Sequence, residues 1–313
     1  MLIVAGVIGA FLIVLQYHFP YQLEVFAHPK AYARGLQYAA RGAGAFMNPN
    51  NAACVMACLA LLTLPAVRLQ SSFLMKAAVW MSTAVLVLGL IYTRSRSGFL
   101  ALSLPLLGMA IVGRDKIASW SILLLGLIVL ILFSGYSQLM IERMQEAYNP
   151  ESGEWGYNVL GRFRTWSEYF KTATLRDYIF GQGPMGGIEK NRMEPHSAFV
   201  ALITVYGLGS VLWAVLAVYH FFKRSLALRK ASLPALAAIG RGCIWLLVAW
   251  GIYANTANAL TPSYARYMLF LAVVLLDRAY FLSQYEYDLG VQGEAMWDEG
   301  NGLWSTQNAP AVF

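Results

Sequence analysis

Long apolar runs that carry almost no charge constrain this chain more than any other feature. A helix needs about 20 apolar residues to cross the hydrocarbon core of a bilayer, and about eight runs approach or reach that length. The sequence therefore predicts an all-α, polytopic integral membrane bundle. The runs cover roughly Leu2–Tyr17, Asn51–Val67, Ala77–Tyr92, Phe99–Val112, Ile117–Phe133, Ala198–Phe222, Leu236–Tyr253 and Tyr264–Leu276.

The composition agrees with a membrane protein and argues against several other classes. Hydrophobic residues make up 58% of the 313 residues and charged residues only 12%, against roughly 25% charged residues in an ordinary soluble domain. A soluble enzyme, a disulfide scaffold and a nucleic-acid binder are therefore not expected. Cys54, Cys58 and Cys243 all fall in apolar runs, and their spacing matches no zinc, haem or redox motif.

The basic residues predict how the bundle is oriented. Short cytoplasmic loops carry an excess of Lys and Arg, and alternation through the runs places three basic clusters on one side, which we assign to the cytoplasm. We expect spans in 1–134 and 196–276, a long periplasmic loop in 135–195, and a polar cytoplasmic tail in 277–313. The first run lacks a basic n-region and a cleavage site, so it is expected to be a span rather than a signal peptide. The clusters are Arg68 with Lys76, Arg114 with Lys116, and Lys223, Arg224, Arg229 and Lys230.

Two arginines lie on the external side, where the predicted orientation needs no cation. Arg94 and Arg96 occupy the short turn Thr93–Gly98 between two spans. They either snorkel to the membrane interface or form an anion site, in which guanidinium groups donate paired hydrogen bonds to phosphate oxygens. Asn48 and Asn50, before the second span, add polar groups to the same side, either as helix caps or as ligands of sugar hydroxyls.

The long loop contains an aromatic-rich amphipathic pattern. Residues 161–170 are predicted to form a helix at the interface, with Arg162 and Trp166 four residues apart and therefore on one face. Arg164 adds a second cation. An interfacial aromatic belt with arginines bound to lipid headgroups is the alternative interpretation.

The end of the loop carries a glycine-rich turn and then a histidine. Gly181 and Gly183 predict exposed backbone able to approach a phosphate or a sugar, although such turns are common in loops. His196 directly precedes the sixth span, and histidine exchanges protons near neutral pH. It is a candidate base, with Glu194 as a competitor, although a histidine at a helix start is more often a cap or an interface residue.

Taken in order, these elements resemble the O-antigen ligase and Wzy-type polymerase superfamily of bacterial envelope glycosyltransferases. The resemblance spans about residues 40–225. It departs from the family pattern at Ser197, where the family usually has Asn, and in having fewer spans. The matching segments are Gly44–Asn50, Arg94–Gly98, Gly161-Arg162 with Trp166, Gly181-x-Gly183, and His196 followed by Tyr206–Gly209.

The resemblance implies a GT-C-like membrane glycosyltransferase of the bacterial inner membrane with its active site facing the periplasm. Its donor would be a glycan on undecaprenyl diphosphate. Its acceptor would be a hydroxyl of lipid A core or of a growing glycan, attacked with inversion at the anomeric carbon. Membrane lipids would be its other partners, and no nucleic acid, cofactor or metal is expected, because fixed guanidinium groups would stabilise the leaving diphosphate.

The resemblance also assigns roles to individual residues. Arg96 and Arg162 would hold the diphosphate, with Arg94 and Arg164 ranked second, and His196 would position or deprotonate the acceptor. Substrate-binding candidates are Asn48, Asn50, Trp166, Gly181 and Gly183.

Other functions stay open at this point. The motifs concern the donor, so a ligase, a polymerase and a protein O-oligosaccharyltransferase are hard to separate. A transporter or flippase for lipid-linked sugars would also need arginines near a polar cavity, but it would require charge deep inside the spans. A purely structural membrane subunit is the third alternative.

Overall fold

A computed structural model describes residues 2–19, 42–46, 48–112, 120, 148–149, 154–155, 160–183, 197–256 and 264–295. Helices dominate this part of the chain, as the sequence predicts, and the strands β1 (Tyr148–Asn149) and β2 (Glu154–Trp155) form one short antiparallel pair. The helices are α1 (Leu2–His18), the 3-10 helix η2 (Gly44–Phe46), α4 (Pro49–Arg68), α5 (Phe73–Tyr92), α6 (Arg96–Val112), α9 (Leu160–Thr172), α10 (Leu175–Phe180), α12 (Ala198–Thr204), α13 (Leu208–Leu228), α14 (Pro234–Thr256) and α15 (Tyr264–Ala295).

Several of these helices are suited to a membrane. Within the described residues, four are long and apolar enough to cross one, namely Pro49–Val67, Phe73–Tyr92, Leu208–Leu228 and Pro234–Asn255. Two shorter apolar helices, Ile3–His18 and Arg96–Ile111, accompany them. The predicted span at residues 117–133 falls outside the described residues apart from Trp120.

Helix α4 forms the centre of the bundle, where it contacts α1, α5, α6, α14 and α15. Small side chains allow this close packing. A Cβ atom on Gly98 of α6 would come within 2.3 Å of the Ala53 Cβ of α4, and one on Gly89 of α5 within 2.6 Å of the Ala10 Cβ of α1. In a bilayer no hydrophobic driving force brings helices together, so their association depends on close packing, which small residues at the interface allow.

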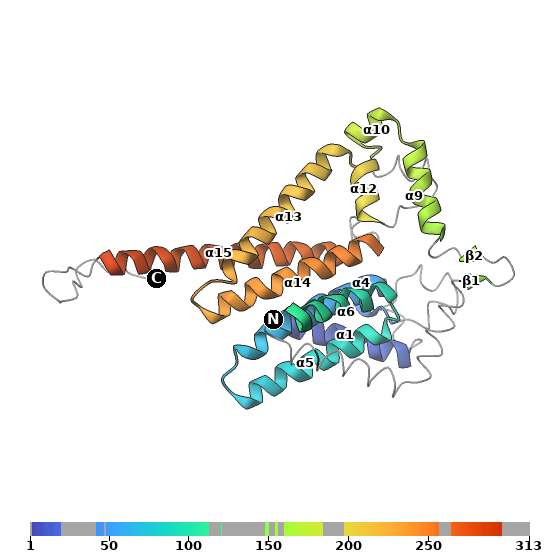
Figure 1. Cartoon of the computed structure of the whole chain (residues 1–313). Helices are drawn as coiled ribbons and strands as arrows, with labels where there is room; N and C mark the ends of the chain where they lie inside the picture. The colour runs from blue at the N-terminus through green and yellow to red at the C-terminus, as the bar shows by residue number, and fades with distance from the viewer. Residues whose placement is uncertain are drawn as a thin grey trace, which may run out of the picture.

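The ends of the bundle helices lie on two opposite sides of the bundle (Figure 1). One end, called here the arginine end, is where α4 and α6 begin and where α1, α5 and α14 finish. The α4–α5 and α13–α14 turns lie together at the opposite end, on the left in Figure 1. These turns follow Arg68 and Arg224, so two predicted cytoplasmic clusters share one end. The third, Arg114 with Lys116, lies outside the described residues.

The structure corrects two boundaries of the sequence prediction. Residues 198–222 are not one span, because α12 ends at Thr204 and α13 begins at Leu208. Gly207 between them has a φ of +81°, which breaks the helix. The polar tail expected from residue 277 begins inside α15, which continues to Ala295 with no proline to stop it.

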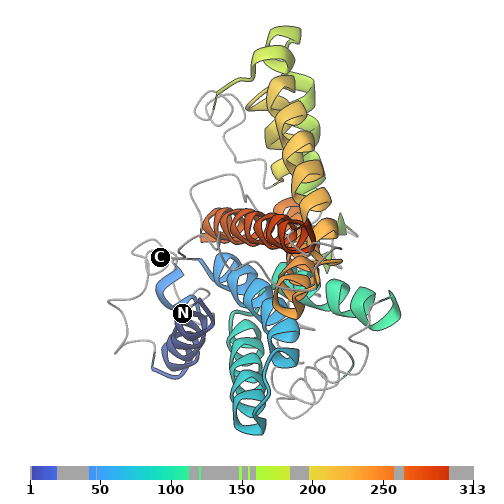
Figure 2. The same cartoon turned by 90° about the vertical axis from the view of Figure 1, so that its left-hand side faces the viewer.

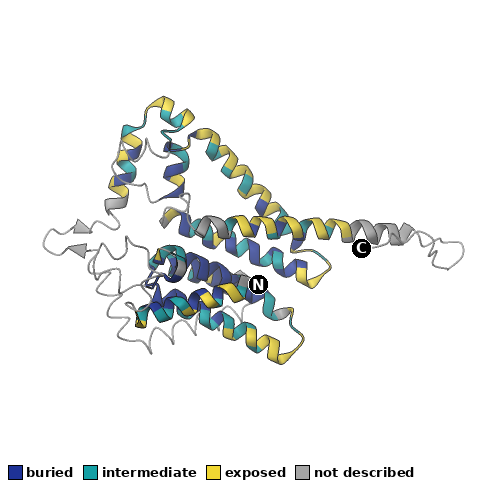
Figure 3. Cartoon of the chain, turned by 180° about the vertical axis from the view of Figure 1, so that it is seen from behind, coloured by how far each residue is buried: buried dark blue, intermediate teal, exposed yellow. Residues whose placement is uncertain are grey.

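Helix α13 leans away from the rest of the bundle and carries α9, α10 and α12 at its far end (Figure 2). Burial follows this arrangement, because α4 is mostly buried whereas α13 and α10 are largely exposed (Figure 3). A small second core joins α9 to α12, apart from the main one.

Candidate functional site

Two helix N-termini meet at the arginine end. Asn48 caps α4 by accepting a hydrogen bond from the Asn50 amide (2.8 Å). Ser95, which directly precedes α6, accepts from the Gly98 amide (3.3 Å) and donates to the Asn50 Oδ1 (2.9 Å). Ser97 Oγ lies 3.0 Å from Ser95 Oγ. Because these bonds join α4 and α6 at their first turns, the positive ends of both helix dipoles point the same way.

Arg96 is the first residue of α6 and is half-buried. A cation at a helix N-terminus opposes the helix dipole, whereas an anion there is stabilised by it. Both interpretations of the turn, phosphate binding and snorkelling, are compatible with this position.

Arg94 has a different environment from Arg96. Its φ of +50° is left-handed, which is uncommon for a residue with a side chain. The residue is 6% exposed, and its guanidinium donates from Nη2 to the Tyr17 hydroxyl (2.5 Å), with Cζ 5.0 Å from the Tyr17 ring centroid. The Arg94 side chain is thus held against α1.

An aromatic cluster surrounds this contact. Tyr17 and Tyr92 meet edge to face with centroids 4.8 Å apart, and His18 Nε2 lies 3.1 Å from the Tyr92 hydroxyl. Tyr17, Tyr92 and His18 are not among the predicted site residues, because 74 or more residues separate the partners in the sequence. The sequence carries only a weak signal for this cluster, because the apolar runs that contain Tyr17 and Tyr92 each end at that tyrosine.

Further polar contacts tie neighbouring segments to this end of the bundle. Gln16 Oε1 accepts from the amides of Ala43 (2.9 Å) and Gly44 (2.7 Å), which fastens the segment leading toward α4 to α1. The Tyr253 hydroxyl donates to Asn51 Oδ1 (2.5 Å), which brings the end of α14 to the start of α4. The arginine end is therefore built from α1, α4, α5, α6 and α14.

The loop candidates form a second group. The helix predicted over 161–170 is present as α9. Trp166 packs beside fully buried Tyr169 in the small core shared with α12, and its ring meets Phe163 at 5.0 Å. Arg164 is exposed. Arg162 lies in the first turn of α9, and its side chain lies outside the described residues.

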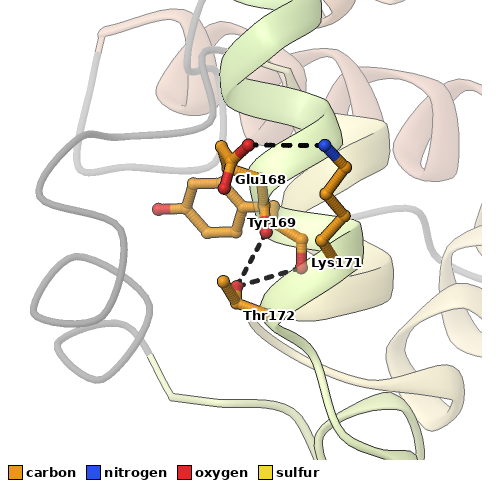
Figure 4. A network of polar contacts seen from close by, with 4 residues as sticks. All are labelled: Glu168, Tyr169, Lys171 and Thr172. Carbon is orange, nitrogen blue, oxygen red and sulfur yellow. Dashed lines mark hydrogen bonds and ion pairs between the residues drawn. The ribbon is translucent and has the colours of Figure 1, made fainter.

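On the exposed side of α9, Lys171 and Glu168 form an ion pair with each other (Figure 4). Lys171 Nζ lies 3.7 Å from Glu168 Oε1, and the Thr172 hydroxyl donates to the Glu168 carbonyl (2.8 Å). Both charged side chains are more than half exposed. Such a pair contributes little to stability.

The glycine turn after α10 packs against the break between α12 and α13. The amides of Gln182 and Gly183 donate to the carbonyls of Thr204 (3.0 Å) and Val205 (2.9 Å). A Cβ on Gly181 would lie 2.3 Å from the Val205 carbonyl oxygen. These glycines therefore have a structural role, in agreement with the alternative that such turns are common in loops.

Helix α12 links the two groups. Ser197 is its N-cap and accepts from the Val200 amide (3.4 Å), while Ala198 belongs to the main core. The hydroxyl of Ser197, the residue after the candidate histidine, thus caps α12. His196 and Glu194 lie outside the described residues.

The structure thus brings some predicted site residues together and separates others. Asn48, Asn50, Arg94 and Arg96 meet at the arginine end. Arg164, Trp166, Gly181 and Gly183 belong to the α9–α10 group. A comparison with protein-family models found no match for this chain, and a comparison with curated proteins found none either.

Proposed function

We propose that the chain is a metal-independent, inverting glycosyltransferase of the bacterial inner membrane, similar to O-antigen ligases and polymerases. Its donor is a glycan on undecaprenyl diphosphate, and its acceptor is a hydroxyl of lipid A core or of a growing glycan. The arginine end faces the periplasm. The protein in this proposal has about eight membrane spans in a GT-C-like arrangement.

One observation carries the proposal. Arg96 begins α6 at the point where Ser95 and Asn50 join the starts of α4 and α6. This cation and both helix dipoles attract an anion, and they lie at the end of the bundle opposite the basic α4–α5 and α13–α14 turns. A diphosphate leaving group fits such a site, because its charge grows as the glycosidic bond breaks.

The reaction is a single displacement. The acceptor oxygen bonds to the anomeric carbon while the bond from that carbon to the diphosphate oxygen breaks, and the electron pair leaves with the diphosphate. Arg96 and Arg162 donate hydrogen bonds to the diphosphate. His196 takes the acceptor proton, with Glu194 as the competing base.

Some of the other candidates have supporting roles in this proposal. Arg94, held by Tyr17, positions the turn that carries Arg96. Asn48 and Asn50, at the arginine end, border the glycan. Arg164, Trp166, Gly181 and Gly183 belong to the α9–α10 group and are not assigned to the diphosphate site.

The test is turnover by the full chain in nanodiscs with a polyprenyl-diphosphate glycan, candidate acceptors and a chelator. We expect Arg96→Ala and Arg162→Ala to lower kcat by about 10²–10³-fold each, as loss of an electrostatic donor does. We expect His196→Ala to lower it by about 10²–10⁴-fold. Arg229→Ala is the matched control, because Arg229 is an exposed arginine at the opposite end of the bundle, and it should retain full activity.

The outcomes separate the alternatives. Turnover that requires a divalent metal, or full activity in all three site variants, would contradict the proposal. A product ladder indicates a polymerase, a single transfer indicates a ligase, and glycosylated Ser or Thr indicates a protein O-oligosaccharyltransferase. Movement of the lipid-linked sugar across vesicles without a new glycosidic bond would instead indicate a transporter.

A further inference from the structure

Helix α10 and the first turns of α13, which contact each other, both expose large apolar side chains, called here the apolar strip. Leu175 and Phe180 are each 76% exposed, and no residue of α10 is buried. The backbone of α10 contacts Gly207, the residue before α13, so the end of α10 adjoins the start of α13. The strip consists of Leu175, Ile179, Phe180, Leu208 and Leu212.

The strip is held in place and cannot simply turn inward. Thr174 and Asp177 form a reciprocal capping box at the start of α10. At its end, two backbone hydrogen bonds from Gln182 and Gly183 fasten the chain to α12. The Tyr178 hydroxyl also donates to the Phe170 carbonyl of α9 (2.9 Å). The exposure of the strip is therefore a property of the folded structure.

The surface of α13 indicates what covers the strip. This helix is one of the candidate spans, yet only 17% of its most apolar stretch is buried inside the protein. The rest of that stretch faces lipid if α13 crosses the bilayer. Helix α10 adjoins the N-terminal end of α13, so its apolar side chains continue that lipid-facing surface to the level of the headgroups.

The charges beside the strip suit the same environment. Arg176 on α10 and Arg164 and Lys171 on α9 are all exposed. Cations that flank an apolar helix face are typical of helices lying in the interfacial layer, where they meet lipid phosphates. Trp213, 73% exposed on α13, adds an aromatic side chain of the kind enriched at interfaces.

We propose that the apolar strip embeds in the bilayer leaflet at the arginine end and holds the α9–α10 pair at the depth of the headgroups. The occupant of this surface is phospholipid. The proposal does not depend on the enzymatic reaction proposed above, because it follows from α10, α13 and their neighbours alone.

Single-cysteine labelling tests the depth of the strip. The native Cys54, Cys58 and Cys243 are all fully buried, so a maleimide fluorophore reacts at an introduced cysteine. Phe180→Cys reports on the strip, and Lys230→Cys, in the exposed turn between α13 and α14, is the matched control. Each full-length variant is placed in nanodiscs of phosphatidylethanolamine and phosphatidylglycerol, with and without lipid carrying a nitroxide near the headgroup.

We expect the label at residue 180 to have blue-shifted emission, to be quenched by the nitroxide lipid, and to be protected from aqueous iodide. The label at residue 230 should be quenched by iodide. Leu175→Cys provides a second reporter should labelling at residue 180 disturb the fold. Iodide quenching at 175 and 180 equal to that at 230 would overturn the proposal, and so would protection from both quenchers, since the latter indicates a protein partner or a second copy of this chain.

Discussion

The contact between α10 and the start of α13 leads to a sharp prediction for Gly207. Its φ of +81° and ψ of 173° lie in a region that essentially only glycine occupies, and holding another residue there costs about 1–3 kcal/mol. A Cβ would also lie 2.6 Å from the Ile179 carbonyl oxygen and 2.7 Å from the Gly181 amide nitrogen. Both contacts are backbone atoms, so the clash cannot be relieved by turning a side chain.

Gly207→Ala should therefore push α10 away from α13. The two backbone hydrogen bonds from Gln182 and Gly183 would then weaken, at about 0.5–1.5 kcal/mol each. Together with the backbone strain, we expect a loss of about 2–6 kcal/mol from the free energy of local opening. Gly209→Ala is the matched control, because a Cβ at Gly209 meets nothing within 4 Å.

Hydrogen exchange of the full chain in nanodiscs measures this effect. The amides of residues 175–183 should exchange at least about tenfold faster in Gly207→Ala, since 1.4 kcal/mol corresponds to a factor of ten when opening limits exchange. They should be unchanged or slower in Gly209→Ala. Equal protection of these amides in both variants would refute the argument, because neither the strain nor the clash would then exist.

Three further predictions concern the bundle, each measured as the free energy of unfolding in denaturing detergent. Arg94→Gly should be more stable than Arg94→Ala by about 1 kcal/mol, because glycine relieves the left-handed φ of +50° and both variants lose the same side chain; equal stability would contradict the left-handed conformation. Thr63 and Thr83, buried with hydroxyls 2.7 Å apart, should show a coupling of about 0.6 kcal/mol in a double-mutant cycle with valine, and additive effects would show that the bond contributes nothing. Gly98→Ala should destabilise the α4–α6 packing by about 1–3 kcal/mol, and Ala53→Gly should restore it, since the two Cβ atoms would otherwise lie 2.3 Å apart.

Local patterns predicted much of the secondary structure because they depend on nearby residues. Apolar runs marked α1, α4, α5, α6 and α14 to within a few residues. The aromatic pattern at 161–170 identified α9. Asn48 was correctly considered as a cap, because capping depends only on the next few amides.

The break inside residues 198–222 could not be predicted in the same way. Gly207 follows an apolar stretch in which a glycine is tolerated within a helix, and nothing nearby in the sequence excludes that reading. The turn around Gly181, some 26 residues earlier, donates hydrogen bonds to the end of α12 beside this break. That contact is tertiary, and the presence of Gly207 in the sequence does not reveal it.

The sequence alone determined the all-α class, most of the long apolar helices and the uneven distribution of arginines, because apolar length and charge are read directly along the chain. Only the tertiary structure decided what each arginine contacts. Arg94 and Arg96 are two residues apart and look equivalent in the sequence. The left-handed turn directs Arg94 onto Tyr17, 77 residues away, whereas Arg96 begins α6 where two helix dipoles meet. Such a difference depends on backbone direction and on partners distant in sequence, which residue types and spacing do not encode.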